Sequence, residues 1–465
     1  MQVSHTPVAV RAVFDEPNLV ADAGLVPVIR LAEKAGLPGL VEQAVRIKGA
    51  DNGGGAHPVA KVMSLVAAMC AGADSIDDTG RLRHGAMPAL FSGIRAPSTL
   101  GTFLRPFTHG HTLQLHAAHR KFLARLAACT PLLPGAADLA FVDIDSTHKR
   151  VYGRAKQGAQ VGRFKGIRTL HPLLATISTP TARPVIAAVR LRQGRSADVR
   201  GAPKLIAETI ATAREAGCTG TLLVRGDSKF YNADVIAACR RRGAHFSVVT
   251  GTNPSIHKAI AAIEEDTWQQ ISYPTGTADP DTGEMIYDAD ITEIPAYTAF
   301  TGRKKAEQVT ARLIVRRVRD LAKPPVVGEQ GELFSVWRYH PVFTDNPAPL
   351  VEAEAQHRQH AIVEQAIADG KSGPLAHLPS GHFNANAAWL ILWAITHNLL
   401  RAAGTLASVF HAKASTSTLR GHLIHVPARI ARSGRRLKLH LPQRWPWQGA
   451  WTRLFDTVHA PPETG

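Results

Sequence analysis

One stretch decides the fold: Ala140-Phe141-Val142-Asp143-Ile144-Asp145-Ser146-Thr147. A short apolar run leads into acidic residues, which predicts a buried strand with a carboxylate at its end. A second stretch repeats this design, Thr221-Leu222-Leu223-Val224-Arg225-Gly226-Asp227. Carboxylate oxygens are the ligands that hard divalent cations prefer. If both strands lie in one sheet, Asp145 and Asp227 are candidates to hold a metal ion at its edge.

The residues around these stretches predict an α/β fold. We expect strands at 139–145, 168–177, 184–191, 221–227 and 245–250, and helices at 203–216 and 232–242. Three strands that can form a meander, followed by alternating helices and strands, give the order of an RNase H-like core. In that order one acid ends the first strand and another ends the fourth. Asp145 and Asp227 stand at those two places.

The charge of the chain favours a polyanionic partner. Its 465 residues include 54 Lys plus Arg and 37 Asp plus Glu, a formal net charge of +17. An excess of this size favours nucleic acid first and an anionic membrane second. The most apolar segment, 385–400, is shorter than the roughly 20 residues of a membrane span, so we expect a buried helix and no membrane partner. Four scattered cysteines without a C-x-x-C pair, and no apparent signal peptide, favour a cytoplasmic protein.

Residues 1–135 are expected to form a helical region that binds DNA or mediates dimerisation. Apolar residues recur at helical spacing over 27–35, 59–71 and 113–128. A further short helix is expected within 95–106, with Ser98 as its cap and Pro106 at its end. Such a helix could enter a DNA groove or pack within a small bundle. The sequence does not decide between these two roles.

The first part of the core, 136–270, is followed by a predicted β insertion at 271–345. Residues 273–290 are rich in turn formers. The segments 291–297, 310–318 and 334–343 alternate apolar with polar or charged residues, as half-exposed strands do. The insertion is also basic, with Lys304, Lys305, Arg312, Arg316, Arg317 and Arg319.

The second part of the core, 346–465, carries the third acid and the strongest basic signal. A helix over 351–368, with Gly370 as its stop, would place His357, His360, Glu364 and Lys371 on one face. Between Asp369 and Asp456 the chain has no Asp or Glu but eleven Lys or Arg. An acid-free tract of this length favours a surface that contacts DNA phosphates. Its candidate contacts are Arg429, Arg432, Arg435, Arg436 and Lys438.

These residues fit the chemistry of phosphodiester cleavage. Two metal ions about 4 Å apart can activate the attacking water and stabilise the leaving 3′ oxygen. Magnesium prefers oxygen ligands and keeps several waters, so a few carboxylates suffice. Asp145 is the candidate to bridge two Mg²⁺ ions, with Asp227 and Glu364 beside it. A strand-end Asp is often only a turn former, so the case depends on the combination of three acids with a basic chain.

At these residues the sequence resembles bacterial insertion-sequence transposases of the DDE superfamily with a Tyr-Arg-Glu-Lys signature, in the IS-thirteen-eighty-like branch. Asp145-Ser146-Thr147 resembles the first-acid motif and Arg225-Gly226-Asp227-Ser228 the second. Glu364 and Lys371 match the spacing of the third. His357 stands where the signature has Tyr and His360 where it has Arg, with Arg358 beside them. The match puts His357, Arg358, His360 and Lys371 among the expected DNA contacts.

The resemblance implies a transposase that cuts the terminal inverted repeats of an insertion sequence and joins the 3′ ends to target DNA. Two Mg²⁺ ions, replaceable by Mn²⁺, would serve as cofactors. A homodimer would hold two double-stranded ends in a bacterial, nucleoid-associated complex. Related enzymes form a hairpin with help from an aromatic residue of the insertion, a role open here to Trp337 or Trp268.

Two rival interpretations remain open at this stage. Asp143-Ile144-Asp145-Ser146-Thr147 also fits D-x-D-x-T, the nucleophile motif of haloacid-dehalogenase-like phosphatases, with Asp143 as nucleophile. A non-catalytic DNA-binding protein with a decayed nuclease core is the second alternative. The sequence also leaves open whether Asp143 or Asp145 is the first metal ligand, because both lie on one face of the strand.

Overall fold

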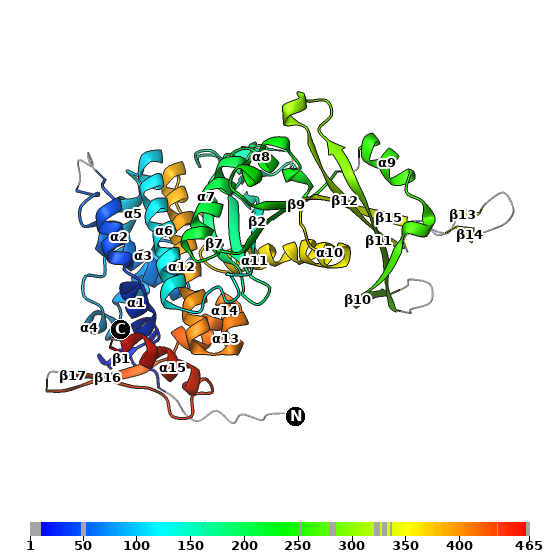
Figure 1. Ribbon diagram of the computed structural model, residues 1–465. Coiled ribbons are helices and arrows are strands. Elements are labelled where there is room, and N and C mark those ends of the chain that lie inside the picture. Colours follow the sequence, from blue (N-terminus) through cyan, green and yellow to red (C-terminus); the bar gives the residue numbers. More distant parts are fainter. Residues whose placement is uncertain are drawn as a thin grey trace.

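The computed structural model describes residues 11–47, 53–162, 164–251, 253–278, 285–319, 326–327, 333–334, 337–434 and 436–461. It is a mixed α/β protein built on a nine-stranded mixed sheet. Helices of the N-terminal region lie to one side of this sheet, and its outermost strands extend to the other side (Figure 1). The fold therefore joins a helical half and a sheet half through one continuous core.

The centre of the sheet has five strands in the order β7, β6, β2, β8, β9. The first three are antiparallel neighbours, whereas β2, β8 and β9 run parallel. Helix α7 (Ala202–Glu215) follows β7, and α8 (Ala233–Arg241) follows β8, so the expected succession of strands and helices is confirmed. The strand bounds are Leu139–Ser146 for β2, Leu173–Ser178 for β6, Val185–Arg190 for β7, Thr221–Gly226 for β8 and His245–Val249 for β9.

The predicted strand at 168–177 is divided in the structure. Its first part is β5 (Arg168–Leu170), which belongs to a small sheet with β3 (Lys149–Arg150) and β4 (Gln160–Val161). Its second part is β6. Pro172 lies between the two parts, and proline lacks the N–H that a continuous ladder would need.

Strands after β9 extend the same sheet. Strand β15 (Trp337–Thr344) pairs antiparallel with β9 and is followed outward by β12 (Val309–Arg319), β11 (Met285–Ala299) and β10 (Gln269–Ala278). The sequence predicted strands here, but not that they would continue the central sheet. The expected turn-rich character of 273–290 was wrong, because β10 and β11 occupy its described part. Residues 279–284 lie outside the described residues.

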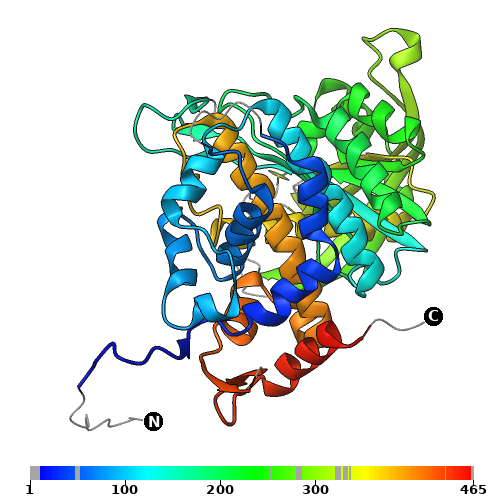
Figure 2. The same ribbon diagram turned by 90° about the vertical axis from the view of Figure 1, so that its left-hand side faces the viewer.

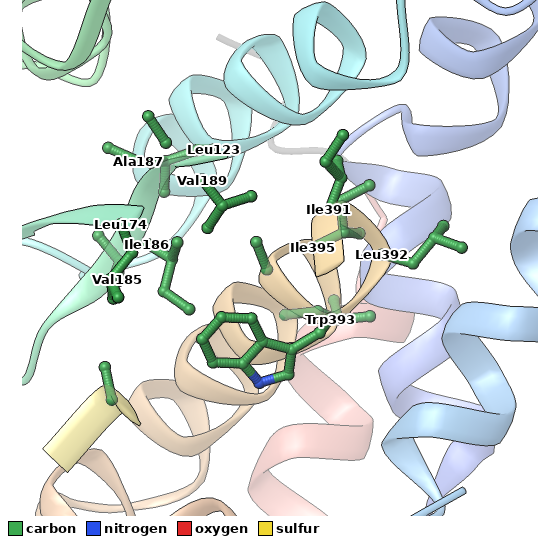
Figure 3. Close-up of a cluster of buried hydrophobic side chains, with 14 of the residues drawn as sticks. Leu123, Leu174, Val185, Ile186, Ala187, Val189, Ile391, Leu392, Trp393 and Ile395 are labelled. Atoms are coloured by element: carbon green, nitrogen blue, oxygen red, sulfur yellow. The ribbon is translucent and has the colours of Figure 1, made fainter. Parts of the chain in front are cut away.

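One long helix joins the two halves. Helix α12 (Phe383–Ala407) is buried along most of its length, as its apolar sequence predicted. It contacts β7 on the sheet side, and α6 (His109–Cys129) and α3 (Pro58–Cys70) on the helical side. Figure 2 shows the N-terminal helices gathered around it, and Figure 3 shows its Ile395 in one apolar cluster with Ile186 and Val189 of β7 and Leu123 of α6. No helix of the described residues combines the length and apolarity that crossing a bilayer requires.

The short helix predicted near 95–106 packs into the core. Helix α5 (Pro97–Leu104) buries Leu100 and Phe103 and contacts α3 and α12, which supports the bundle role over the groove-reading role. Its N-cap is Ala96 with Pro97 in the first turn, so the expected Ser98 cap was wrong. Helices α1 (Leu25–Lys34) and α2 (Leu37–Ala44) complete this side.

The helix of the third acid is interrupted. Helix α10 (Leu350–Arg358) passes through a 3-10 turn into α11 (Val363–Lys371). The expected stop at Gly370 was wrong, because Gly370 lies inside α11. A Cβ on Gly370 would stand 2.6 Å from Cζ2 of Trp393, so glycine allows α11 to approach α12 closely. The last helix of the described residues is α15 (Gln448–His459), which follows a two-stranded ribbon of β16 (Ala428–Ser433) and β17 (Arg436–His440).

Candidate active site

Two carboxylates stand at neighbouring strand ends in the middle of the sheet. The parallel register of β2 and β8 pairs Ile144 with Gly226. Asp145 and Asp227 are the next residues on the two strands. Asp145 is half-buried, whereas the Asp227 side chain is 36% exposed and begins a 3-10 turn by accepting from the backbone N–H of Lys229 at 3.0 Å. The structure thus brings together the first and second acids that the sequence proposed.

The surroundings of Asp145 destabilise its ionised form. Burial raises the pKa of Asp145, and the charge of Asp227 raises it further. The backbone N–H of Ser146, which donates to Oδ1 at 2.6 Å, acts in the opposite direction but does not offset these effects. A raised carboxyl pKa means that the ionised form is destabilised there. A cation between the two carboxylates would relieve this repulsion, so their oxygens fit a hard metal ion.

Asp143 has a different environment two residues earlier. Its carboxylate is fully buried and accepts from Nε and Nη2 of Arg225, each at 2.7 Å. Nδ1 of His360 lies 2.9 Å from its Oδ1. Burial would raise the pKa of Asp143, but the charges and hydrogen bonds of Arg225 and His360 hold it below the usual value. Asp143 is therefore an ionised, fully partnered group inside the protein.

Glu364 is not gathered with the two aspartates in this conformation. It lies exposed in the first turn of α11. Across the part of the chain that the structure describes, no three His, Cys, Asp or Glu side chains are grouped closely enough to hold a metal ion. Helix α11 nevertheless contacts β2. The His360–Asp143 contact lies in the turn before this helix, and Lys371 at its end lines a small pocket with Thr147 and Lys149.

The remaining residues of the predicted third motif have unequal access to solvent. His357 is 8% exposed, and its Nδ1 lies 2.8 Å from the hydroxyl of Ser247. Burial lowers the pKa of His357 to about 3, so the ring is neutral. Arg358 approaches Glu354 at 3.7 Å. We assign His357 to the core, since a buried neutral ring is not placed to contact a phosphate.

Two further residues of this site were not identified from the sequence. Nζ of Lys229 lies 3.4 Å from Oδ2 of Asp227. Burial would lower the pKa of Lys229, but Asp227, Asp198 and Asp145 raise it above its usual value. Asp198 accepts from the hydroxyl of Ser146 at 2.6 Å, which ties it to the residue after Asp145. The available signals were the adjacency of Lys229 to Asp227, and the position of Asp198 as the first acid after Asp145.

The predicted basic contacts of the C-terminal region lie on the β16–β17 ribbon. Arg429, Arg432, Arg436 and Lys438 are exposed. Arg435 lies outside the described residues. The two aromatic candidates of the insertion flank one guanidinium: Arg317 lies 4.2 Å from the Trp268 ring centre and 4.4 Å from that of Trp337. Each tryptophan thus already has a cation stacked on its ring.

Comparison with known proteins identifies a family. A family model described as "Transposase DDE domain group 1" matches residues 3–462. No curated protein matches the chain. One solved structure, described as "Cryo-EM structure of piggyBac transposase synaptic complex with hairpin DNA", is similar at a TM-score of 0.41 and 9% identity, over 96% of this chain and 83% of that chain. This TM-score and identity are too low to support a functional inference.

Proposed function

The chain belongs to the transposase family with a DDE domain, group 1, and from this premise we propose that it cuts the terminal inverted repeats of an insertion sequence and joins their 3′ ends to target DNA. The observation that carries the proposal is the pair formed by Asp145 and Asp227. They follow the last paired residues of β2 and β8, and burial together with the charge of Asp227 raises the pKa of Asp145. Such a pair suits hydrolysis and transfer at a phosphodiester.

We propose an RNase H-like core for the five strands β7, β6, β2, β8 and β9. Support comes from their order, with three antiparallel strands followed by two parallel ones, and from an acid at the ends of the first and fourth strands in the chain. The proposed division places a helical DNA-binding region at 1–135, the core at 136–270 and 346–465, and the β insertion at 271–345. A homodimer acting on two DNA ends and the IS-thirteen-eighty-like branch remain part of the same proposal.

Asp145 and Asp227 are proposed to hold two Mg²⁺ ions, with Glu364 as the third ligand. Bound there, the ions would stabilise charge on the phosphate and lower the pKa of the attacking water. For Glu364 to take part, α11 must shift or its side chain must turn when DNA and metal bind. The protein's own contribution is position: β2 and β8 hold the two aspartates, and the contact between His360 and Asp143 anchors the turn before α11 to β2.

Lys229 is proposed to neutralise part of the carboxylate charge before the ions bind. Its ammonium lies at Asp227 and interacts electrostatically with Asp198 and Asp145. The phosphatase alternative loses its support, because Asp143 is fully buried and its carboxylate is occupied by Arg225 and His360. A nucleophile needs a free oxygen that can reach the substrate.

A labelled terminal-repeat duplex tests the proposal. Incubation with Mg²⁺ is expected to produce a nick with a 3′ hydroxyl, and omission of the metal to prevent it. Asp145→Asn, Asp227→Asn and Glu364→Gln should each reduce nicking by at least about a hundredfold and leave DNA binding intact. Binding without cleavage by the unaltered protein would favour a non-catalytic DNA-binding protein. Full activity of Glu364→Gln would remove Glu364 from the site.

A further inference from the structure

The β16–β17 ribbon stands out from the rest of the fold. Near its base, β16 pairs with β1 (Leu19–Val20), and the backbone N–H of Ile430 donates to Asn18 at 2.9 Å. Beyond this point the ribbon has only its two strands. It projects from the lower edge of the helical half, away from the outer strands of the large sheet (Figures 1 and 2). One end is thus anchored and the other is free to contact a partner.

The register of the ribbon sorts its side chains into two faces. Directly opposed residues in an antiparallel pair project to the same side, and successive residues alternate. Ile430 is opposite Leu439, and Arg432 is opposite Leu437, so these four share the face that is buried against the protein near its base. The other face, which we call the outer face, consists of Arg429, Ala431, Ser433, Arg436, Lys438 and His440.

The outer face is basic and accessible. Arg429, Arg436 and Lys438 are exposed on it, as are Ser433 and His440. Glu16 approaches Arg429 at 3.5 Å from the N-terminal segment, which leaves this arginine 58% exposed. The surrounding 86 residues from 370 to 455 contain no acid. The face therefore presents cations from both strands, and Lys438 and Arg436 of β17 lie opposite the small side chains of Ala431 and Ser433 on β16.

The shape of this face selects one binding mode. Two paired strands are about 4.8 Å apart, and the major groove of DNA, about 12 Å wide, admits such a ribbon with its side chains. Ala431 and Ser433 let the backbone of β16 approach the base edges, while their partners on β17, Lys438 and Arg436, reach the phosphates. We propose that the outer face enters the major groove of the terminal repeat and contributes to its recognition. This inference rests on the proposed function and divides its C-terminal contacts: Arg436 and Lys438 touch DNA, whereas Arg432 does not.

Fluorescence anisotropy without Mg²⁺ tests the assignment separately from catalysis. Dissociation constants would be measured over a range of salt concentrations for a terminal-repeat duplex and a scrambled duplex of the same composition. Arg436→Ala and Lys438→Ala should each weaken binding to the repeat by about three- to tenfold and reduce the salt slope by about 1. Arg432→Ala removes the same charge from the opposite face and is the matched control, expected to leave both quantities unchanged.

The outcomes separate this inference from the proposed function. Equal weakening by Arg432→Ala and Arg436→Ala would overturn the assignment of faces. The weakening caused by loss of Arg436 or Lys438 should be similar on the two duplexes, because phosphate contacts carry no sequence information. Ala431→Leu, which would hold the backbone away from the base edges, should instead reduce the preference for the repeat over the scrambled duplex, and an unchanged preference would overturn recognition through the groove. If the variants show the predicted differences in dissociation constant but the unaltered protein never nicks DNA, the inference would stand and the proposed function would be refuted. Because the three basic side chains are exposed, unchanged melting temperatures are expected and would confirm that each of their variants folds.

Discussion

The two acids of β2 show how a shift of two residues along a strand separates a carboxylate with a counter-charge from one that faces another carboxylate. Asp143 pairs directly with Arg225 in the parallel register, so an ion pair is built into the sheet. Asp145 lies beyond the last pair of residues and faces Asp227. Both acids share a strand face, which is why the sequence left the choice between them open. The second stretch contained the information needed to choose between them. Arg225 precedes Asp227 by two residues, just as Asp143 precedes Asp145, so pairing the two acids also pairs Asp143 with Arg225.

Asp143→Asn is expected to destabilise the protein strongly. The substitution leaves the buried guanidinium of Arg225 without its counter-charge, and breaking such a pair costs about 3–5 kcal/mol. Asp145→Asn is the control on the same strand. Its carboxyl pKa is raised in the folded state, so loss of that charge should leave the free energy of unfolding unchanged or slightly increased.

Urea unfolding of both variants at pH 7 would measure these differences. Equal destabilisation by the two substitutions would contradict the distinction between a paired and a repelled carboxylate. In the nicking assay the two variants should rank the other way. Asp145→Asn should be stable but inactive, whereas the folded fraction of Asp143→Asn should still nick DNA, because it keeps the residues proposed to hold metal.

At the scale of elements, the contact between α11 and α12 positions the third acid. Gly370→Ala would bring a methyl group 2.6 Å from Cζ2 and 2.9 Å from Cε2 of Trp393. The ring is wedged in the core, so α11 must move, at a cost of about 1–3 kcal/mol. Because Glu364 lies on α11, the nicking rate should fall even at temperatures where the variant is still fully folded. Gly421→Ala is the control, since nothing lies within 4 Å of its added Cβ, and its melting temperature should be maintained or raised.

Arg317 links several segments of the outer strands through its side chain. Arg317 of β12 donates to Asp290 at 2.8 Å and to Glu265, while its guanidinium lies between the rings of Trp268 and Trp337. We expect Arg317→Ala to cost about 2 kcal/mol, because stacking and charge-assisted bonds are lost together. Arg317→Lys should not rescue it, since an ammonium cannot stack as a planar group.

Melting followed by tryptophan fluorescence would report this change, with Arg303→Ala as the control. Arg303 is an exposed residue of the same insertion, 3.9 Å from Asp234 and 3.7 Å from Glu307, and such pairs contribute at most about 1 kcal/mol. A loss of stability in Arg303→Ala as large as that in Arg317→Ala would argue that the insertion is held by charge alone.

The elements that could be predicted are those whose pattern is local. Strands β2 and β8 were found from apolar runs, and α12 from its uninterrupted apolar sequence. The 3-10 turn before α11 and the Gly370 contact were not found, since each depends on a neighbour distant in sequence. The burial of His357 could not be foreseen either, because a histidine on a helix face has no marker of depth.

At the scale of the molecule, the sheet could be predicted only in part. The sequence predicted strands in the insertion but not which strands of the sheet they would pair with. In the structure β15 covers the edge of β9, and an open strand edge is a liability that proteins avoid. Asp145 and Asp227 meet because parallel neighbours end at the same side of a sheet. Glu364 comes from a helix whose exact place no local pattern determines.

Buried histidines should make the whole molecule acid-sensitive well above the titration of its carboxylates. Burial lowers the pKa of His119 and His357 to about 3, and that of His171 and His397 to about 4. The unfolded chain titrates these residues near 6.5. Below that pH the unfolded state binds more protons than the folded state, so stability falls as the pH falls, by up to about 1.4 kcal/mol per pH unit for each residue.

Two carboxylates act in the opposite direction. The pKa values of Asp145 and Glu354 are raised, so the folded state binds a proton there before the unfolded state does, and stability rises as the pH falls through the raised values. Four strongly shifted histidines outnumber these two carboxylates, so the histidine effect should dominate between pH 6.5 and 5. Urea unfolding at pH 8, 7, 6 and 5 should show constant stability down to about pH 7 and a steep decline below it, with proton uptake on unfolding by calorimetry. A flat profile from pH 7 to 5 would mean that these rings are protonated inside the fold, and it would contradict the prediction.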